Sequence, residues 1–206
     1  VLSIGNAVPF AIGGFSSRTV QTVVAEGEPV GFIRGYKAVL NPDNSLKEIL
    51  PLQNLGSTLP TAYGNFSLSA SYKNLSFMLS GDYQYGAYVH SFDRQFRFSK
   101  GLKDDAIPEK ALEGLDQGAN WLNFTNFFVE KSDFLKIRNI GIAYDYKPKK
   151  YLKSVNLAFN VYNPFAFTAS SVDPEAALAG ARSQGAVAVG GLNYSSYSTP
   201  RQYVGT

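Results

Sequence analysis

The segment from Gly64 to Gly86 alternates apolar and polar side chains on both sides of a Lys73–Asn74 break. A period of two predicts β-strands, and a two-residue break between strands predicts an antiparallel hairpin. Strand pairing carries the apolar face continuously from one strand to the next. The apolar positions are Phe66, Leu68, Ala70, Tyr72, Leu75, Phe77, Leu79, Gly81, Tyr83 and Tyr85.

A second hairpin is predicted around the charged break at Lys147–Lys150. Residues 139–146 and 154–161 alternate in the same way, with Ile, Val, Leu, Phe and Tyr on one face. Leu135 and Ile137 are apolar on the opposite parity, so a β-bulge near Arg138 is expected to shift the register.

Short and long connections alternate along the chain. The breaks at Lys73–Asn74 and 147–153 are short, whereas Ser99–Asn126 and Pro164–Thr199 are long. Connections longer than about 12–15 residues are uncommon in compact soluble domains, and outer-membrane barrels combine short periplasmic turns with long external loops. Within the long connections, 108–115 and 174–181 are candidate short helices, the second with Asp173 as its cap and Pro174 at its first position.

The composition of the polar face favours a membrane barrel over a soluble sandwich. Neither Lys nor Glu occurs in 65–71 or in 76–84, although a water-facing sheet surface normally carries them. In a transmembrane barrel the apolar face meets lipid, the small polar face lines a lumen, and aromatic girdles lie at the interfaces. Tyrosines at strand ends suit such girdles: Tyr63, Tyr72, Tyr83, Tyr85 and Tyr88. The fold class is therefore predicted as all-β, an antiparallel transmembrane β-barrel with long external loops.

Composition excludes several other classes. Of the 206 residues only 17% are charged, 14% are aromatic, one is His and none is Cys. The absence of Cys and the single His exclude a thiolate metal site, a disulfide scaffold and a His-rich metal cluster. No run approaches the ~20 apolar residues of a membrane helix. The net charge is only +3 and the basic residues are scattered, which gives no footprint for nucleic acid.

Several segments in order resemble the C-terminal part of the SusC/RagA-type TonB-linked outer-membrane proteins. The longest runs from Phe128 to Tyr144 and continues through the 148–153 turn into 155–163. The shorter ones are 27–31 with 35–37, 55–60, 71–75, 173–175 and 197–203. Together they cover most of the chain from about Glu26 onward. Within these segments, the residues for which we expect a structural role are Gly31, Gly35, Tyr36, Arg138, Asn139, Asn163, Asp173, Pro174, Glu175, Pro200 and Arg201.

The resemblance implies a large barrel in the outer membrane of Bacteroidota-like bacteria that imports oligosaccharides or peptides. It also implies an N-terminal plug that contacts TonB, a SusD-like surface lipoprotein as a lid, and contact with outer-membrane lipid. Residues 1–206 are expected to be the C-terminal portion of such a barrel, without the plug and the earlier strands. The family continues into a final strand beyond the Tyr203–Thr206 end, so the last strand is expected to be truncated. About five clear strands are too few to close a pore, because the smallest barrels need about eight.

Candidate chemistry is sparse, and the chain is predicted not to be an enzyme and to need no cofactor. Asp104, Asp105 and Glu109 offer paired carboxylates, but nearby lysines favour a solvated loop. His90 is interpreted as an interfacial residue, since no Ser or Cys partner is suggested. Calcium at Asp173 and Glu175 would need more ligands, so helix capping by Asp173 is preferred.

Two sets of residues are candidates for binding. Arg138 and Asn139 are expected to form a hydrogen-bond network facing the lumen. Trp121, Tyr194 and Tyr197 lie in the long loops, where they would either contact substrate or the lid or pack among the loops. The main hypothesis is the barrel portion of a TonB-dependent importer. A SusC-like barrel acting as a structural subunit without transport and a soluble carbohydrate-binding β-sandwich remain as alternatives.

Overall fold

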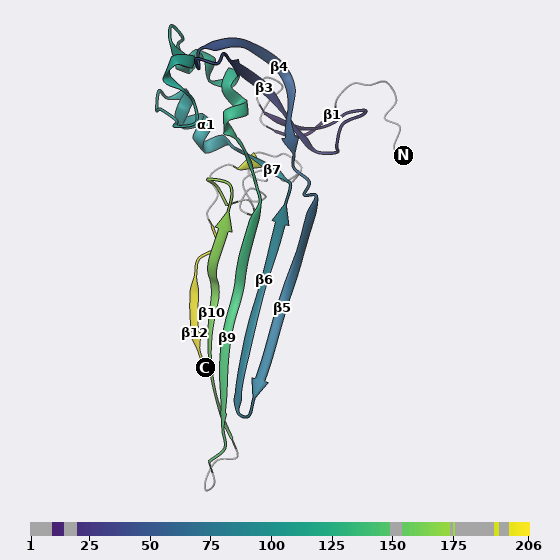
Figure 1. Cartoon of the computed structure of the whole chain (residues 1–206), viewed down its shortest axis with the longest axis vertical. Helices are drawn as coiled ribbons and strands as arrows, with labels where there is room; N and C mark the ends of the chain where they lie inside the picture. Colours follow the sequence, from purple (N-terminus) through teal and green to yellow (C-terminus); the bar gives the residue numbers. More distant parts are fainter. Residues whose placement is uncertain (1–9, 15–19, 149–153, 174, 176–191, 194–197) are drawn as a thin grey trace.

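The computed structural model describes residues 10–14, 20–148, 154–173, 175, 192–193 and 198–206. These residues form a long, narrow sheet with a compact head at one end (Figure 1). Apart from the two-residue parallel pairing of β11 (Leu192–Asn193) with β7 (Tyr88–Ser91), the described strand pairs are antiparallel. The antiparallel all-β fold expected from the alternation is therefore confirmed.

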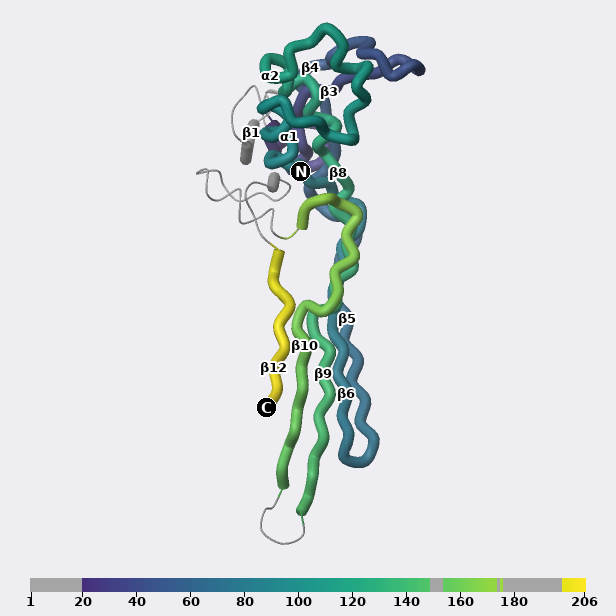
Figure 2. Tube along the Cα trace, turned by 90° about the vertical axis from the view of Figure 1, so that its left-hand side faces the viewer, coloured from purple at the N-terminus to yellow at the C-terminus, as the bar shows by residue number. Residues whose placement is uncertain are grey.

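The long sheet is a five-stranded meander in which spatial order follows chain order. Its strands are β5 (Ala62–Tyr72), β6 (Leu75–Tyr85), β9 (Phe134–Tyr146), β10 (Val155–Thr168) and β12 (Gln202–Gly205). Figure 2 shows these strands side by side in one layer, below the head. No second layer of described residues covers either face of the lower sheet.

Both predicted hairpins are present. The pairing from Ala62 with Tyr85 to Tyr72 with Leu75 is unbroken, and Lys73 takes a φ of 55° at the turn. The bulge expected near Arg138 is also confirmed, because Arg138 is the extra residue of β9 against β6. Against β10, this one residue faces two, Asn163 and Pro164.

The sheet carries rows of apolar residues that run across the strands on one face. In the middle of these rows, Leu68 pairs with Leu79, Leu79 with Ile140 and Ile140 with Val161. Leu68, Phe77 and Phe159 are exposed. Tyrosines end the rows, with Tyr72 and Tyr144 at the turn end and Tyr83 and Tyr85 at the head end. The soluble sandwich needs these residues inside a globule, so the exposed face argues against it.

The head combines a second sheet with a helical segment. The four-stranded sheet contains β1 (Phe10–Gly14), β2 (Gln21–Val24), β3 (Phe32–Leu40) and β4 (Leu46–Ser57). Between β7 and β8 (Val129–Lys131) lie α1 (Phe92–Ser99), η1 (Glu109–Leu112), α2 (Gln117–Asn120) and η2 (Trp121–Phe128). Buried Phe98, Phe124 and Phe128 form its core with Ala38, Ile107 and Ala111.

Several local expectations need correction. Residues 99–126 are not an open loop, because their apolar side chains pack into the head core. The helix predicted over 108–115 is only the 3₁₀ turn η1, which ends at Leu112. The connection predicted to start at Pro164 starts after Thr168, since β10 continues through the bulge. Tyr88 packs against Val20 and Ile33 in the head, away from the exposed tyrosines. The helix predicted at 174–181 lies outside the described residues.

No helix in the described part of the chain has the length and hydropathy needed to cross a bilayer.

Candidate functional site

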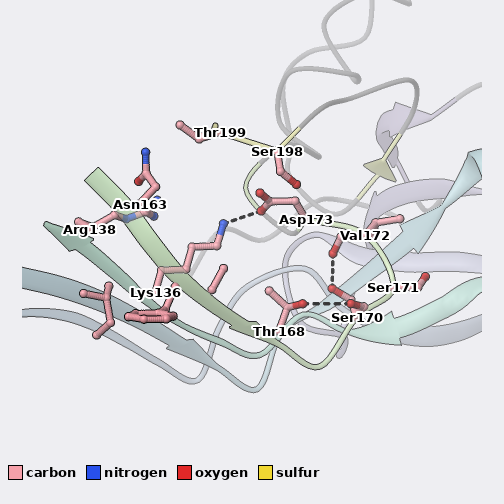
Figure 3. A pocket seen from close by; sticks show the side chains of 13 residues that line it. Lys136, Arg138, Asn163, Thr168, Ser170, Ser171, Val172, Asp173, Ser198 and Thr199 are labelled. Carbon is pink, nitrogen blue, oxygen red and sulfur yellow. Dashed lines mark hydrogen bonds and ion pairs between the residues drawn. The ribbon is translucent and has the colours of Figure 1, made fainter. Parts of the chain in front are cut away.

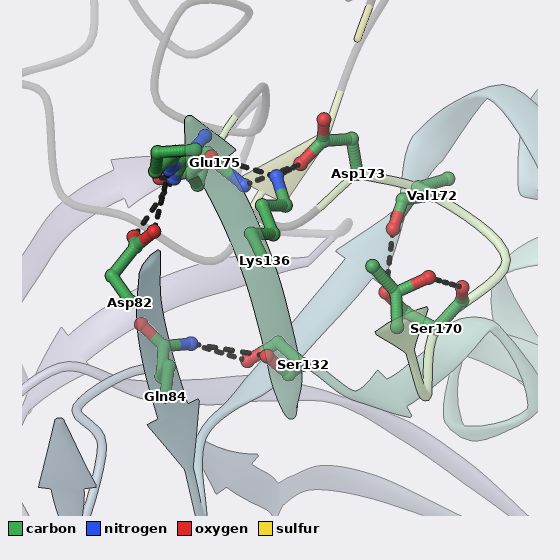
Figure 4. A network of polar contacts seen from close by, with 10 residues as sticks. Asp82, Gln84, Ser132, Lys136, Ser170, Val172, Asp173 and Glu175 are labelled. Carbon is green, nitrogen blue, oxygen red and sulfur yellow. Dashed lines mark hydrogen bonds and ion pairs between the residues drawn. The ribbon is translucent and has the colours of Figure 1, made fainter. Parts of the chain in front are cut away.

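A network of charged side chains lies on the polar face of the long sheet, at its head end (Figure 4). Strand pairing brings Asp82 of β6 opposite Lys136 of β9. The bulge then brings Arg138 to the same carboxylate, so that its Nε and Nη2 donate to Asp82 Oδ1 and Oδ2 at 2.5 and 2.8 Å. The segment after β10 adds Asp173 and Glu175 from above.

Each cation of the network is held by two carboxylates. Lys136 Nζ donates to Asp173 Oδ1 and to Glu175 Oε2, both at 2.6 Å. Arg138 donates to the other oxygen of Glu175, in addition to Asp82. The ion pairs therefore form a continuous row in which each residue contacts the next: Asp82, Arg138, Glu175, Lys136 and Asp173. Two cations face three carboxylates, which leaves a formal charge of −1.

Burial differs sharply along this network. The Lys136 side chain is 5% exposed and that of Asp173 is 12% exposed, whereas Glu175 is 37% exposed. Burial acts to raise the pKa of Asp173, but hydrogen bonds from Lys136 and from the Glu175 backbone N–H outweigh it and lower that pKa. A buried ammonium without its partner is costly, so Lys136 and Asp173 need each other.

A cavity of about 210 Å³ lies beside the network (Figure 3). Lys136 and Asp173 line it together with hydroxyl-bearing residues, among them Thr168 and Ser170, and with apolar residues such as Phe165. The Thr168 and Ser170 hydroxyls donate to backbone carbonyl oxygens, so they can serve a ligand as acceptors next to the paired lysine.

Pro200 and Arg201 contact the β10 side of the bulge. Asn163 stands at a φ of 51° and donates to the Pro200 carbonyl oxygen at 3.2 Å. Arg201 donates to the Pro164 carbonyl oxygen at 2.5 Å, and its guanidinium lies 5.8 Å from the ring centre of Phe165. These contacts fix the place where Arg138 leaves the regular ladder.

A short strap, residues 169–173, connects this network to the head. Ser171 donates its backbone N–H and hydroxyl to Glu130 at 2.5 and 2.8 Å. Glu130 also pairs with Arg94, which binds Asp104 through two hydrogen bonds. The strap therefore bridges ion pairs on the head and on the sheet.

The structure brings together many of the residues singled out in the sequence. Arg138, Asp173 and Glu175 form the network, while Asn163, Pro200 and Arg201 fasten the adjacent bulge. Asn139 is buried at the bulge, and its Oδ1 has no hydrogen-bond partner among the described residues. Pro174, Tyr194 and Tyr197 lie outside the described residues.

The remaining motif residues and Trp121 belong to the head. Gly31 has a φ of 76°, and its carbonyl oxygen accepts from Thr58. A Cβ on Gly35 would lie 2.7 Å from Thr125 Cγ2, so β3 can approach η2 only with glycine there. Tyr36 is a half-buried residue of the same strand. Trp121 is half-buried against the head core and meets Phe92 edge-on at 6.2 Å.

Of the other candidate groups, Asp105 is exposed, and the rest are paired or buried. Asp104 binds Arg94, and Glu109 pairs with Lys103 at the surface. His90 is not an interfacial residue: it is fully buried in the head and lies 2.6 Å from Gln95 Oε1. Desolvation lowers its pKa to about 4, although the hydrogen bond to Gln95 opposes this shift. The described residues contain no group of three or more His, Asp or Glu placed to hold a metal ion.

Sequence reasoning missed Lys136 and Asp82 as parts of the site. Asp82 is the one acidic residue of 76–84, and Lys136 has the parity of the polar face once the bulge is counted. The pairing that joins them links residues 54 positions apart, which periodicity alone does not reveal.

Comparison with known proteins gives a likeness in structure. No protein-family model and no curated protein matches the sequence. A structure of the RagAB peptide importer in the open-open state aligns with all of this chain, with a TM-score of 0.63 and 18% identity. A structure of the closed-closed state aligns with 90% of this chain, with a TM-score of 0.59 and 19% identity. A structure described as the RagAB peptide transporter aligns with 92% of this chain, with a TM-score of 0.57 and 18% identity.

This chain spans about a quarter of the length of those chains, between 23% and 25%. At such low identity the likeness establishes a shared fold for the aligned part. The long meander and its head are thus a known arrangement, found in part of the RagAB structures.

Proposed function

We propose that this chain forms part of the barrel wall and external head of a TonB-dependent importer in a bacterial outer membrane. The wall would carry oligosaccharides or peptides past its polar face, with a SusD-like lipoprotein as the lid and TonB acting on a plug elsewhere in the protein. This portion would bind and guide cargo without covalent chemistry. The likeness to the RagAB importer supports the proposal.

The exposed apolar face is the observation that carries this proposal. All paired residues on that face are uncharged, and many of its large apolar side chains are exposed. A monomeric soluble protein rarely exposes a contiguous apolar patch of this extent. Lipid is a solvent in which such a face is stable.

The length of the strands fits the same interpretation. The 11 residues of β6 span roughly 33 Å along the strand. At a tilt of about 40°, this becomes about 25 Å along a barrel axis, close to the apolar band of outer-membrane barrels. Tyr85 and Tyr83 then lie at one interface, and Tyr72 and Tyr144 at the other.

A matched pair of lysine substitutions in the full-length protein tests whether the apolar face of the sheet meets lipid. Leu68 and Ser67 are adjacent exposed residues on opposite faces of β5. Leu68→Lys should destabilise the folded barrel by about 2–4 kcal/mol because it places an ammonium near the bilayer midplane. Ser67→Lys should have little effect because it faces water. The measurement is urea unfolding in lipid vesicles, followed by heat-modifiable migration on gels.

Equal tolerance of both lysines would show that the apolar face does not meet lipid. Uptake of labelled oligosaccharides and peptides by cells carrying the full chain then separates an importer from a structural barrel. A barrel that inserts normally but takes up neither cargo, with TonB present, would favour the structural alternative.

A further inference from the structure

We propose that Arg138 and Lys136 form a carboxylate-binding site that the Glu175 side chain occupies as an internal stand-in. A ligand carboxylate would replace that of Glu175 at the two cations. This inference rests on the proposed function, because it names carboxylated cargo as the substrate class received at the head end of the polar face.

The shape of the contact points to a carboxylate receptor. The two oxygens of Glu175 are taken by two different cations, Oε2 by Lys136 and Oε1 by Arg138. Both donors come from a single strand, β9, whose bulge sets their spacing. The carboxylate comes from a separate connection that follows β10. Two donors on one strand thus receive an acid from a different segment, as they would receive one from a ligand.

Glu175 is the carboxylate that the cations can release most readily. Asp82 already holds Arg138 through two hydrogen bonds, and Asp173 already holds the buried Lys136. Without Glu175 the two pairs are therefore neutral, so neither cation is left uncompensated. Glu175 also has the most exposed side chain of the network. A partly exposed ion pair contributes little stability, which permits exchange with a ligand.

The neighbouring cavity gives the rest of the ligand a place. It shares Lys136 and Arg138 with the network, and the rest of its lining is partly apolar and partly polar, the polar residues including Asn163, Thr168 and Ser198. Such groups hydrogen-bond to the polar parts of a peptide or of a sugar. A carboxylate on a peptide side chain and the carboxylate of a uronic acid have the same chemistry here, so the test must separate the two sources.

Calorimetric titration of the purified full-length protein in detergent provides that test. The peptide probes are acetyl-Ala-Glu-Ala-amide and its neutral counterpart acetyl-Ala-Gln-Ala-amide. The sugar probes are trigalacturonate and neutral galactotriose. Glu175→Gln should bind the carboxylated member of one pair about five-fold more tightly than the wild type does, because it removes the internal competitor. The affinity for the neutral members should not change.

Two further variants complete the design. Asp43→Asn removes a comparable exposed carboxylate, paired with Lys110 in the head, and should leave every affinity unchanged. Adding Arg138→Gln to Glu175→Gln should abolish the gain, since the receptor has lost a donor. The peptide pair and the sugar pair show which source of carboxylate is used.

The proposal is overturned if carboxylated and neutral probes bind alike, if neither carboxylated probe binds, or if Glu175→Gln changes no affinity. These outcomes are independent of the lysine test of the barrel wall. A protein that inserts as a barrel but fails the titration loses only the carboxylate site.

Discussion

At the scale of single residues, Gly81 shows how closely the strands of the long sheet approach. A Cβ at this position would lie 2.5 Å from the Lys136 carbonyl oxygen and 2.5 Å from Phe66 Cζ. The phenyl ring therefore covers the glycine across the hairpin, an arrangement known to support glycines within sheets.

Gly81→Val should destabilise the folded full-length protein by about 1–3 kcal/mol, because the new side chain collides with backbone that cannot move aside. Urea unfolding monitored by tryptophan fluorescence would measure the loss. Gly205→Val is the matched control, since a Cβ at Gly205 in β12 meets nothing within 4 Å. Similar losses for the two variants would contradict this explanation.

His90 makes the head sensitive to acid. Its pKa is about 4 in the folded protein and about 6.5 in an unfolded chain. Between these values the unfolded state binds more protons, so the free energy of unfolding falls as the pH drops from 6.5 toward 4. The loss from this residue is at most about 3 kcal/mol.

Hydrogen-exchange protection factors of α1 and η2, compared at pH 7 and pH 5, would measure this effect. His90→Gln should reduce the difference in protection between the two pH values. If the variant retains the full difference, other groups cause the acid sensitivity.

At the scale of elements, the bulge between β9 and β10 depends on the backbone of Asn163. A φ of 51° is unfavourable for most residues and especially for β-branched ones, although asparagine tolerates it. Asn163→Val should therefore cost about 1–3 kcal/mol. Asn163→Gly keeps the backbone conformation and loses only the hydrogen bond to Pro200, so it should cost clearly less. Urea midpoints of the two full-length variants test this order, and equal midpoints would contradict it.

The elements also show what sequence can predict and what it cannot. The β5–β6 hairpin was predictable because it is local, unbroken in register and separated by a two-residue turn. The pairing of β3 with β4 shifts register three times, which erases the alternation over residues 32–57. In α1, Phe92, Phe96 and Phe98 lie two or four residues apart, so the pattern does not single out a helix.

The sequence predicted several residues of the candidate site, but it did not predict how they contact one another. Resemblance to a family singled out Arg138, Asp173 and Glu175, but their contacts join residues 37 or more positions apart in the sequence. Lys136 and Asp82 were missed because their importance depends on strand register across the bulge. Only the folded sheet brings these charges together.

At the scale of the whole molecule, the strap ties the head to the charged network of the sheet, beside the direct connection from β8 to β9. On the head side, Glu130 receives both the backbone N–H and the hydroxyl of Ser171, and Arg94 holds Glu130 in place. On the sheet side, Asp173 binds Lys136. Loss of either anchor should therefore loosen the strap while the other anchor persists.

Glu130→Gln should raise the amide exchange rate of residues 169–173 by about ten-fold, because a neutral amide binds the Ser171 N–H less strongly than a carboxylate does. Exchange in the paired core of β5 and β6 should not change. Glu109→Gln removes an exposed carboxylate paired with Lys103 and serves as the control. Hydrogen exchange with mass spectrometry of the full-length protein would measure both. Unchanged exchange in the strap would show that Asp173 and the hydrogen bond from the Ala169 N–H to the Asp133 carbonyl oxygen are enough to hold it.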